Sequence, residues 1–289
     1  MLKNYTHSGV DEAGKSSSKL KMGIAVGIVI SGNYLAGAIW MPVIQNMVNS
    51  DGWRGAYETL AVFCVLVMPV LAIILYKRAP VEKEDSAADG TGRTERPLGM
   101  APKMLQSCVC LAGIGCCVAM AVPQVHIIAY VTDLGFEAIH GAWMGTIALG
   151  CGIISRVVSG AISDRIGGLN TLLFGSGLQL LALCLYLPFK SLTALYLIAA
   201  LFGLSQGGIV PSYTIIIRTF FKAADAGWRI GMALFFTLFG MALGGWLAGA
   251  IYDLTGSYDA AFINAIAFNI ANLMIAAELR RRANRFGVA

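Results

Sequence analysis

The sequence predicts an all-α, polytopic membrane protein with eight transmembrane helices. Hydrophobic residues make up 57% of the 289-residue chain and charged residues only 13%, whereas soluble domains carry about 25% charged residues. Eight strongly apolar segments run along the chain, and the basic residues gather in alternate connectors between them. A buried protein core does not account for so low a charge content, so lipid is the expected solvent.

Each predicted span is roughly 18–28 residues long, which is enough to cross ~30 Å of hydrocarbon at 1.5 Å per residue. The spans are 22–47, 57–76, 104–131, 142–162, 171–188, 192–217, 230–252 and 260–279.

The first two spans resemble a second copy of the last two. Lys-Met-Gly-Ile-Ala-Val at 21–26 parallels Arg-Ile-Gly-Met-Ala-Leu at 229–234, and Leu-Ala-Gly-Ala-Ile-Trp at 35–40 parallels Leu-Ala-Gly-Ala-Ile-Tyr at 247–252. Parallel helical repeats are typical of carriers built from two like halves. If the halves are equal, on the order of a hundred residues, or about four helices, are expected ahead of this chain, which makes it N-terminally truncated.

The charge pattern predicts the topology and the division of the chain. Eighteen of the 21 Lys and Arg residues lie in one set of connectors, and only Arg54 and Lys190 lie in the other. The positive-inside rule then places both termini in the cytoplasm of a multi-pass protein in the cell (inner) membrane. The expected parts are a polar N-terminal segment, two helices of the first half, a mobile cytoplasmic linker, and a six-helix second half with a basic C-terminus: 1–20, 21–78, 79–103 and 104–289.

Several other functions are disfavoured by the pattern. Gly9 to Ser16 matches a phosphate-binding loop, but no buried strand precedes it and no parallel-sheet domain follows, so ATP is not an expected ligand. The net charge of +5 is spread over connectors, which argues against nucleic acid. The seven cysteines lie within apolar runs without metal-site spacing, and no enzyme signature is present. No metal or cofactor is expected.

Arg156 is the most informative single residue. It lies eight residues before Asp164, about 12 Å from the cytoplasmic end of its helix, where an arginine costs at least ~2.5–3.5 kcal/mol on insertion scales. Small and polar residues share its helical face, and bulky apolar residues such as Ile154 and Val158 lie opposite. Arg156 should therefore point into the bundle and bind a substrate carboxylate. The alternative is a structural arginine that bonds carbonyls or snorkels.

Other polar residues in the spans are candidates for substrate binding. His126 follows Pro123 and stands near Gln124, where a proline can kink the helix; it could bind substrate, carry a proton, form an outer gate or simply pack. Gln206 and Tyr213 are seven residues apart on one face of the sixth span, where cavity lining and helix–helix hydrogen bonding both fit. For Asn33 in the first span, packing is the favoured interpretation. No acidic residue lies deep in a span.

The fourth span ends in a conspicuous cytoplasmic loop. Asp164 stands at a helix C-terminus, where the dipole disfavours an anion by about 0.3–1 kcal/mol. We expect it to pair with the N-terminal backbone of the seventh span or with a basic side chain near it, Arg229 or Arg218, in a cytoplasmic gate; the alternative is a topogenic charge. The gate motif comprises Gly160, Asp164, Arg165, Gly167, Gly168 and Arg229.

The seventh span carries glycines at four-residue spacing, a pattern that allows close approach of helices. They are Gly240, Gly244, Gly245 and Gly249.

Gly160 to Gly168 resembles the G-x-x-x-D-R-x-G loop of the major facilitator superfamily in its second-half copy. Gly-Trp-Arg-Gly at 52–55, the run from Tyr252 to Tyr258 and the run from His126 to Gly135 resemble its monocarboxylate-transporter and oxalate/formate-antiporter branch. The resemblance implies a twelve-helix fold of two halves, of which this chain carries helices five to twelve. It also implies that Arg156 is the carboxylate-binding arginine of helix eight.

Two residues depart from that branch. Animal monocarboxylate carriers have an aspartate four residues before the arginine, where Gly152 stands here. Oxalate exchangers have a lysine in helix eleven, but the stretch 229–252 contains none. These residues therefore support neither the proton coupling of the first group nor the dianion exchange of the second, and symport with a proton, exchange for a counter-substrate and uniport all stay open.

The sequence thus predicts a secondary carrier of a small organic anion, similar to a monocarboxylate and moved by alternating access. Two alternatives remain at this point. One is a carrier or exporter of a neutral or cationic solute with Arg156 in a structural role, and the other is a truncated membrane fragment that does not transport.

Overall fold

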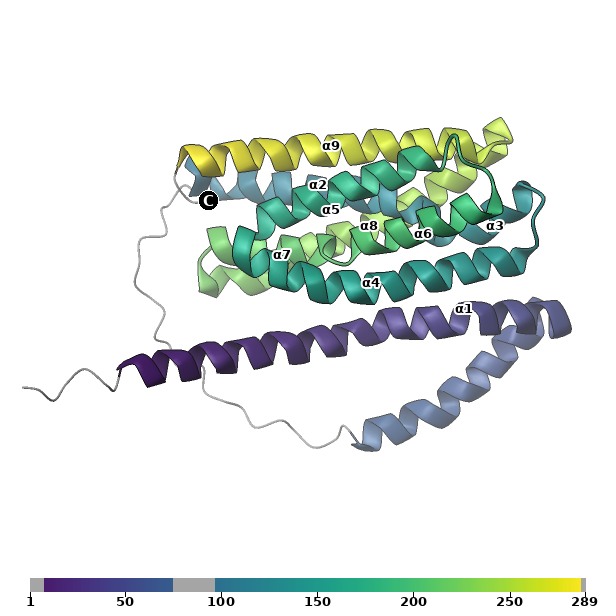
Figure 1. The fold of residues 1–289 in the computed structure, drawn as a ribbon, viewed down its shortest axis with the longest axis horizontal. Coiled ribbons are helices and arrows are strands. Elements are labelled where there is room, and N and C mark those ends of the chain that lie inside the picture. The colour runs from purple at the N-terminus through teal and green to yellow at the C-terminus, as the bar shows by residue number, and fades with distance from the viewer. Residues whose placement is uncertain (1–7, 75–96, 287–289) are drawn as a thin grey trace, which may run out of the picture.

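The computed structural model describes residues 8–74 and 97–286, and each regular element in that part of the chain is helical (Figure 1). The elements are α1 (Ser8–Ile74), η1 (Pro97–Gly99), α2 (Pro102–Val125), α3 (Ile127–Asp133), α4 (Ala138–Ile166), α5 (Gly168–Leu185), α6 (Leu192–Gln206), α7 (Ile209–Phe220), α8 (Ala223–Thr255) and α9 (Tyr258–Arg285). The predicted all-α class is confirmed. Residues Gly9 to Ser16, which match the phosphate-loop pattern, lie in α1 rather than in a loop between strand and helix.

Seven helical stretches in the described residues are long and apolar enough to cross a membrane. The first, Gly32–Ile73, has 42 residues, or about 60 Å at 1.5 Å per residue, which is twice the ~30 Å of a bilayer core. Gly52 interrupts it with φ 71° and ψ 175°, so it provides two crossings. Helices α6 and α7 together form one crossing, Leu192–Phe220.

Both helical hairpins of the predicted repeat turn at a glycine with positive φ. The φ is 71° at Gly52 and 67° at Gly256, a range that other residues adopt only with strain, although ψ differs, 175° at Gly52 and 18° at Gly256. The part of α1 before Gly52 is called its first limb, and the part after Gly52 its second limb. In Figure 1 the first limb of α1 and helix α8 run in the same direction, as a parallel repeat requires. The start of α1 and the end of α9 lie at the same end of the bundle.

The described helices form two blocks: the first is α1, and the second is α2 to α9. Helix α2 lies at the centre of the second block, against α8 and α9. An ideal Cβ on Gly240 would come within 2.8 Å of the Ile114 carbonyl oxygen, and one on Gly244 within 2.6 Å of the Val118 carbonyl oxygen. These two glycines therefore let α8 approach the backbone of α2. A Cβ on Gly249 would only reach ordinary contact, 3.7 Å from His126.

The helices extend beyond the apolar segments from which the spans were predicted. Helix α8 begins at Ala223, well before residue 230, and α4 continues to Ile166. Backbone hydrogen bonding does not require apolar side chains, so a helix continues through the polar interface until a capping residue ends it. Because α8 begins about two turns earlier than predicted, Arg229 lies within the helix and not at its first residue.

Candidate functional site: a cavity and Arg156 between α1 and α4

Helix α1 packs along α4 in an antiparallel register. Tyr34 lies at the level of Gly152, where an ideal Cβ would be 3.0 Å from the tyrosine ring, and Gly37 meets Leu149. Farther along, the Thr146 hydroxyl donates to the Ala38 carbonyl over 2.8 Å. The small residues of α4 thus bring a helix of the first block against the second block.

Arg156 lies on this interface, as its helical position predicts. Its guanidinium carbon is 4.4 Å from the centroid of the Tyr34 ring, and its Nε is buried without a hydrogen-bond partner in the described structure. Ile154 and Val158, on the opposite face of α4, are exposed, as expected for side chains that face lipid. The positive charge is therefore held within the protein side of the helix.

Tyr34 is a site residue that the sequence analysis missed. The polar residue singled out there, Asn33, is exposed, so its expected packing role is wrong for the described structure. Its neighbour Tyr34 is buried against α4. Tyr34 stands two residues before the small residues at 36–38, but only the packing of α1 on α4 identifies its partner.

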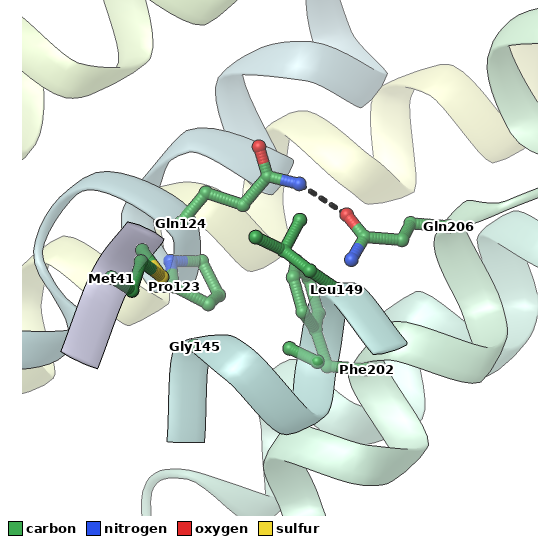
Figure 2. Close-up of a pocket in the computed structure, with 8 residues that line it drawn as sticks. Met41, Pro123, Gln124, Gly145, Leu149, Phe202 and Gln206 are labelled. Atoms are coloured by element: carbon green, nitrogen blue, oxygen red, sulfur yellow. Dashed lines mark hydrogen bonds between the residues drawn. The ribbon is translucent and has the colours of Figure 1, made fainter. Parts of the chain in front are cut away.

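A cavity of about 150 Å³ lies beside this interface (Figure 2). Its walls come from α1, α2, α4 and α6, and the lining residues are Met41, Pro123, Gln124, Gly145, Ala148, Leu149, Phe202 and Gln206. Leu149 is seven residues before Arg156 and therefore shares its helical face, about 10 Å away along the axis. An engineered cavity of ~150 Å³ accepts a benzene molecule, so this volume suits a small organic ligand.

Gln124 and Gln206 supply the polar part of the cavity wall. Gln124 Nε2 donates to Gln206 Oε1, and Figure 2 shows the two side chains pointing toward one another. Both stand near helix breaks, since α2 ends just after Pro123 and α6 ends at Gln206. Of the two interpretations left open for Gln206, cavity lining and helix–helix hydrogen bonding, the geometry contains both.

On both sides of the break after Gln206, the chain lies close to the backbone of α4. A Cβ on Gly203 would come within 2.1 Å of the Ala148 carbonyl oxygen, and one on Gly207 within 2.5 Å of the Arg156 backbone nitrogen. The segment from α6 into α7 therefore runs alongside α4 in backbone contact. This packing sets Gln206 at the membrane depth of Arg156.

His126 lies at the junction of α2 and α3 and contacts α8 and the start of α9. Its Nε2 donates to the Gly245 carbonyl oxygen at 2.9 Å. Its Nδ1 is 3.3 Å from the Tyr258 hydroxyl, which can donate to it when the imidazole is neutral. His126 does not line the cavity, and its contacts fit the packing interpretation among those left open.

Tyr213 does not share the site of Gln206, contrary to the expectation that they occupy one helical face. The break at Gly207 and Gly208 changes the direction of the chain. The Tyr213 hydroxyl donates to Asn272 Oδ1 at 3.1 Å, and Asn272 in turn donates to the Ser176 hydroxyl at 2.9 Å. Tyr213 thus belongs to a buried network that joins α7, α9 and α5.

In the part of the chain that the structure describes, the expected contact of Asp164 with Arg229 is not found. Asp164 is exposed, whereas Arg229 is buried with a guanidinium nitrogen 3.6 Å from Asp225. The expectation for Arg229 was wrong because α8 begins at Ala223, so Arg229 lies inside the helix and not at its positive N-terminal end. The exposed position of Asp164 counts against a closed gate at this loop.

The other residues of the loop have mainly conformational roles. Gly167 separates α4 from α5 at φ 79°, a backbone conformation that favours glycine. A Cβ on Gly168 would lie 3.1 Å from Ile215, so α5 packs closely on α7 there. Gly160 and Arg165 are exposed.

A polar and aromatic cluster at the far end of the bundle was also missed. Lys190 forms an ion pair with Asp259 at the start of α9 and donates to the Tyr130 hydroxyl at 3.2 Å. Burial lowers the pKa of Lys190, but its hydrogen bonds to Asp259 and Tyr130 raise it, and the net direction is upward. The cluster ties the α5–α6 connection to α3 and α9.

The chain matches the family model described as Major Facilitator Superfamily over residues 13–192 and 107–286. It is 26% identical over 250 residues to Monocarboxylate transporter 13 of Rattus norvegicus, covering 86% of this chain and 57% of the relative. It is 24% identical over 268 residues to Monocarboxylate transporter 11 of Mus musculus, covering 89% and 59%. The MFS-type transporter opdF of Penicillium oxalicum is 23% identical over 273 residues, covering 93% and 62%. The chain thus spans about three fifths of the length of these relatives.

Proposed function

Because this chain belongs to the Major Facilitator Superfamily, we propose that it carries a small organic anion across the membrane by alternating access, with Arg156 as the partner of the substrate carboxylate. It is a multi-pass membrane transporter and not an enzyme. The names of the two mammalian relatives support a monocarboxylate as the class of anion.

The observation that carries the proposal is the unpaired charge of Arg156. Among the described residues, no carboxylate lies within ion-pair distance of its guanidinium, and its Nε has no acceptor. The face of Tyr34 contributes about 0.5–2 kcal/mol through a cation–π contact, which is less than the ~2.5–3.5 kcal/mol or more that a mid-membrane arginine costs. A substrate carboxylate would supply the missing counter-charge, and a guanidinium can bind it with two parallel hydrogen bonds.

The position of Arg156 also fits alternating access. Residues 21–78 would supply the last two helices of the first half, residues 79–103 a cytoplasmic linker, and residues 104–289 the second half, with both termini on the cytoplasmic side of the cell membrane. The contact of Tyr34 with Arg156 then crosses the interface between halves. Substrate bound there would be released when the halves rock apart. A coupling proton and a counter-substrate remain alternative driving partners.

The test is uptake of radiolabelled monocarboxylates into proteoliposomes that contain the purified full chain. Arg156→Lys should weaken uptake and Arg156→Ala should nearly abolish it, because lysine keeps the charge but lacks the planar two-point contact. Arg54→Ala, which changes an exposed arginine at the α1 turn, should leave uptake unchanged. Normal uptake by a well-expressed Arg156→Ala variant would show that Arg156 is structural.

A further inference from the structure

The two glutamines in the cavity wall leave hydrogen-bonding capacity unused. Each amide offers two N–H donors and one carbonyl acceptor, and the bond from Gln124 to Gln206 uses one of each. Gln206 is completely buried, and its Nε2 has no acceptor in the described structure. An unpaired buried donor is unfavourable, and native proteins seldom keep one without a reason.

The unused hydrogen-bond donors and acceptor of Gln124 and Gln206 define the kind of chemical group that the pair can bind. Beyond their mutual bond, the pair presents N–H donors on Gln206 and a carbonyl acceptor on Gln124. Exchanging oxygen and nitrogen in both amides at once preserves the bond and again leaves donors on one residue and an acceptor on the other. The site therefore complements a group that both accepts and donates a hydrogen bond.

The rest of the cavity excludes a second charge. The other lining residues are apolar or glycine, and no charged side chain is among them. A carboxylate or an ammonium placed there would lose its hydration without gaining a counter-ion. A neutral hydroxyl needs only one donor and one acceptor, which the glutamine pair supplies.

Arg156 is not among the residues that line the cavity, but its helical position brings its side chain toward the glutamine pair. Gly207, which follows Gln206, is in contact with the backbone nitrogen of Arg156. Side chains on a helix lean toward its N-terminus, so Arg156 on α4 and Gln206 on α6 both lean toward the level of the cavity residue Leu149.

We propose that Gln124 and Gln206 form a specificity-determining pair that recognises a neutral hydroxyl on the substrate whose carboxylate Arg156 binds. The inference rests on the proposed function for the carboxylate but assigns a separate role to the amides. The carrier would accordingly favour hydroxylated monocarboxylates over the parent acids.

The test measures binding of matched acids to the purified full chain by ligand-induced thermal shift and calorimetry. The probes are butanoate, its 2-, 3- and 4-hydroxy derivatives, and the corresponding methyl derivatives as isosteres. At least one hydroxybutanoate should bind roughly 5- to 20-fold tighter than butanoate and its methyl isostere, as expected for a satisfied buried hydrogen bond. Equal affinity for the hydroxy and methyl acids in the unmodified protein would overturn the inference without any variant.

Gln206→Leu should remove the hydroxyl preference while changing butanoate affinity by no more than about two-fold, since leucine keeps the volume but not the donor. Gln179→Leu is the matched control: this glutamine is also completely buried but bonds to Cys116 away from the cavity. It should keep the preference. If Gln206→Leu does not fold, Gln124→Leu provides the second variant, and it should also lose the preference. Retention of the preference in a folded variant of either cavity glutamine contradicts the pair.

The two proposals fail in different ways. Butanoate binding that depends on Arg156 but shows no hydroxyl preference overturns the glutamine pair alone. A hydroxyl preference that depends on Gln206, together with unchanged binding in Arg156→Ala, overturns the role of Arg156. If the unmodified protein binds none of these acids, both proposals are wrong.

Discussion

The Arg156 guanidinium lies over the face of the Tyr34 ring, 4.4 Å from its centroid, although 122 positions separate the two residues in the sequence. Tyr34 comes from the part of α1 before Gly52 and Arg156 from the C-terminal half of α4. This pair joins the two blocks of the chain at the depth of the cavity. Any motion of one block relative to the other must change the surroundings of the arginine.

The first prediction concerns the Tyr34 ring. Tyr34→Phe keeps the π face and should leave carboxylate affinity within about two-fold of the unmodified protein, whereas Tyr34→Leu removes a cation–π contact of about 0.5–2 kcal/mol. If the ring orients the guanidinium, the leucine variant should bind the anion several-fold more weakly in calorimetry. Tyr57→Leu, at an exposed position of the second limb, is the control. A leucine variant with unaltered affinity would show that the ring does not orient Arg156.

The second prediction separates two adjacent glycines in α8. A Cβ at Gly244 would lie 2.6 Å from the Val118 carbonyl oxygen, but one at Gly245 would lie 3.6 Å from the nearest atom of Val125. Gly244→Ala should therefore lower the free energy of unfolding by about 1–3 kcal/mol, as overpacking does, while Gly245→Ala should be tolerated. Thermal unfolding of the two variants in the same detergent measures the difference. Similar melting temperatures would contradict the close approach of α8 to α2.

The third prediction assigns Tyr213 to stability. Asn272→Leu leaves the Tyr213 hydroxyl and the Ser176 hydroxyl without their partner, at about 1–3 kcal/mol for each buried unsatisfied group. The double variant with Tyr213→Phe should lose less stability than the sum of the two single variants, because the groups are in contact. Neither change should alter the ratio of affinities for different carboxylates. A changed ratio of carboxylate affinities in Tyr213→Phe would show that this tyrosine contacts the substrate.

The fourth prediction concerns the ion pair of Lys190 with Asp259. Both side chains are partly exposed, so the pair should contribute at most about 1 kcal/mol. The pKa of Lys190 is raised in the folded state. The stabilisation from the pair is therefore complete below the unfolded-state pKa of about 10.4, and it is lost as the pH rises through the folded-state pKa.

The stability difference between the unmodified protein and Lys190→Met should accordingly stay constant from about pH 7 to 9 and vanish only at strongly alkaline pH. Unfolding midpoints measured across this range provide the check. A difference that already disappears near neutral pH would mean that another titrating group, and not Lys190, controls the stability of this cluster.

The sequence by itself determined the helical class, the positions of the spans and the inward direction of Arg156. These features follow from local rules: a membrane span needs about 20 apolar residues, and side chains at helical spacing share a face. The internal repeat likewise indicated two similar hairpins, and both turn at a glycine with positive φ, Gly52 and Gly256. For these features the periodicity of the side chains was enough.

Only the tertiary structure decided which residues meet. The break at Gly207 directs Gln206 to the cavity and Tyr213 to a separate network, and the start of α8 at Ala223 keeps Arg229 away from the expected contact with Asp164. The pairing of Tyr34 with Arg156 depends on how α1 packs along the small residues of α4. Helix breaks and interhelical register result from packing between segments distant in sequence, where close approach of two backbones is settled by steric fit. A local pattern contains no information about the surface that its partner presents.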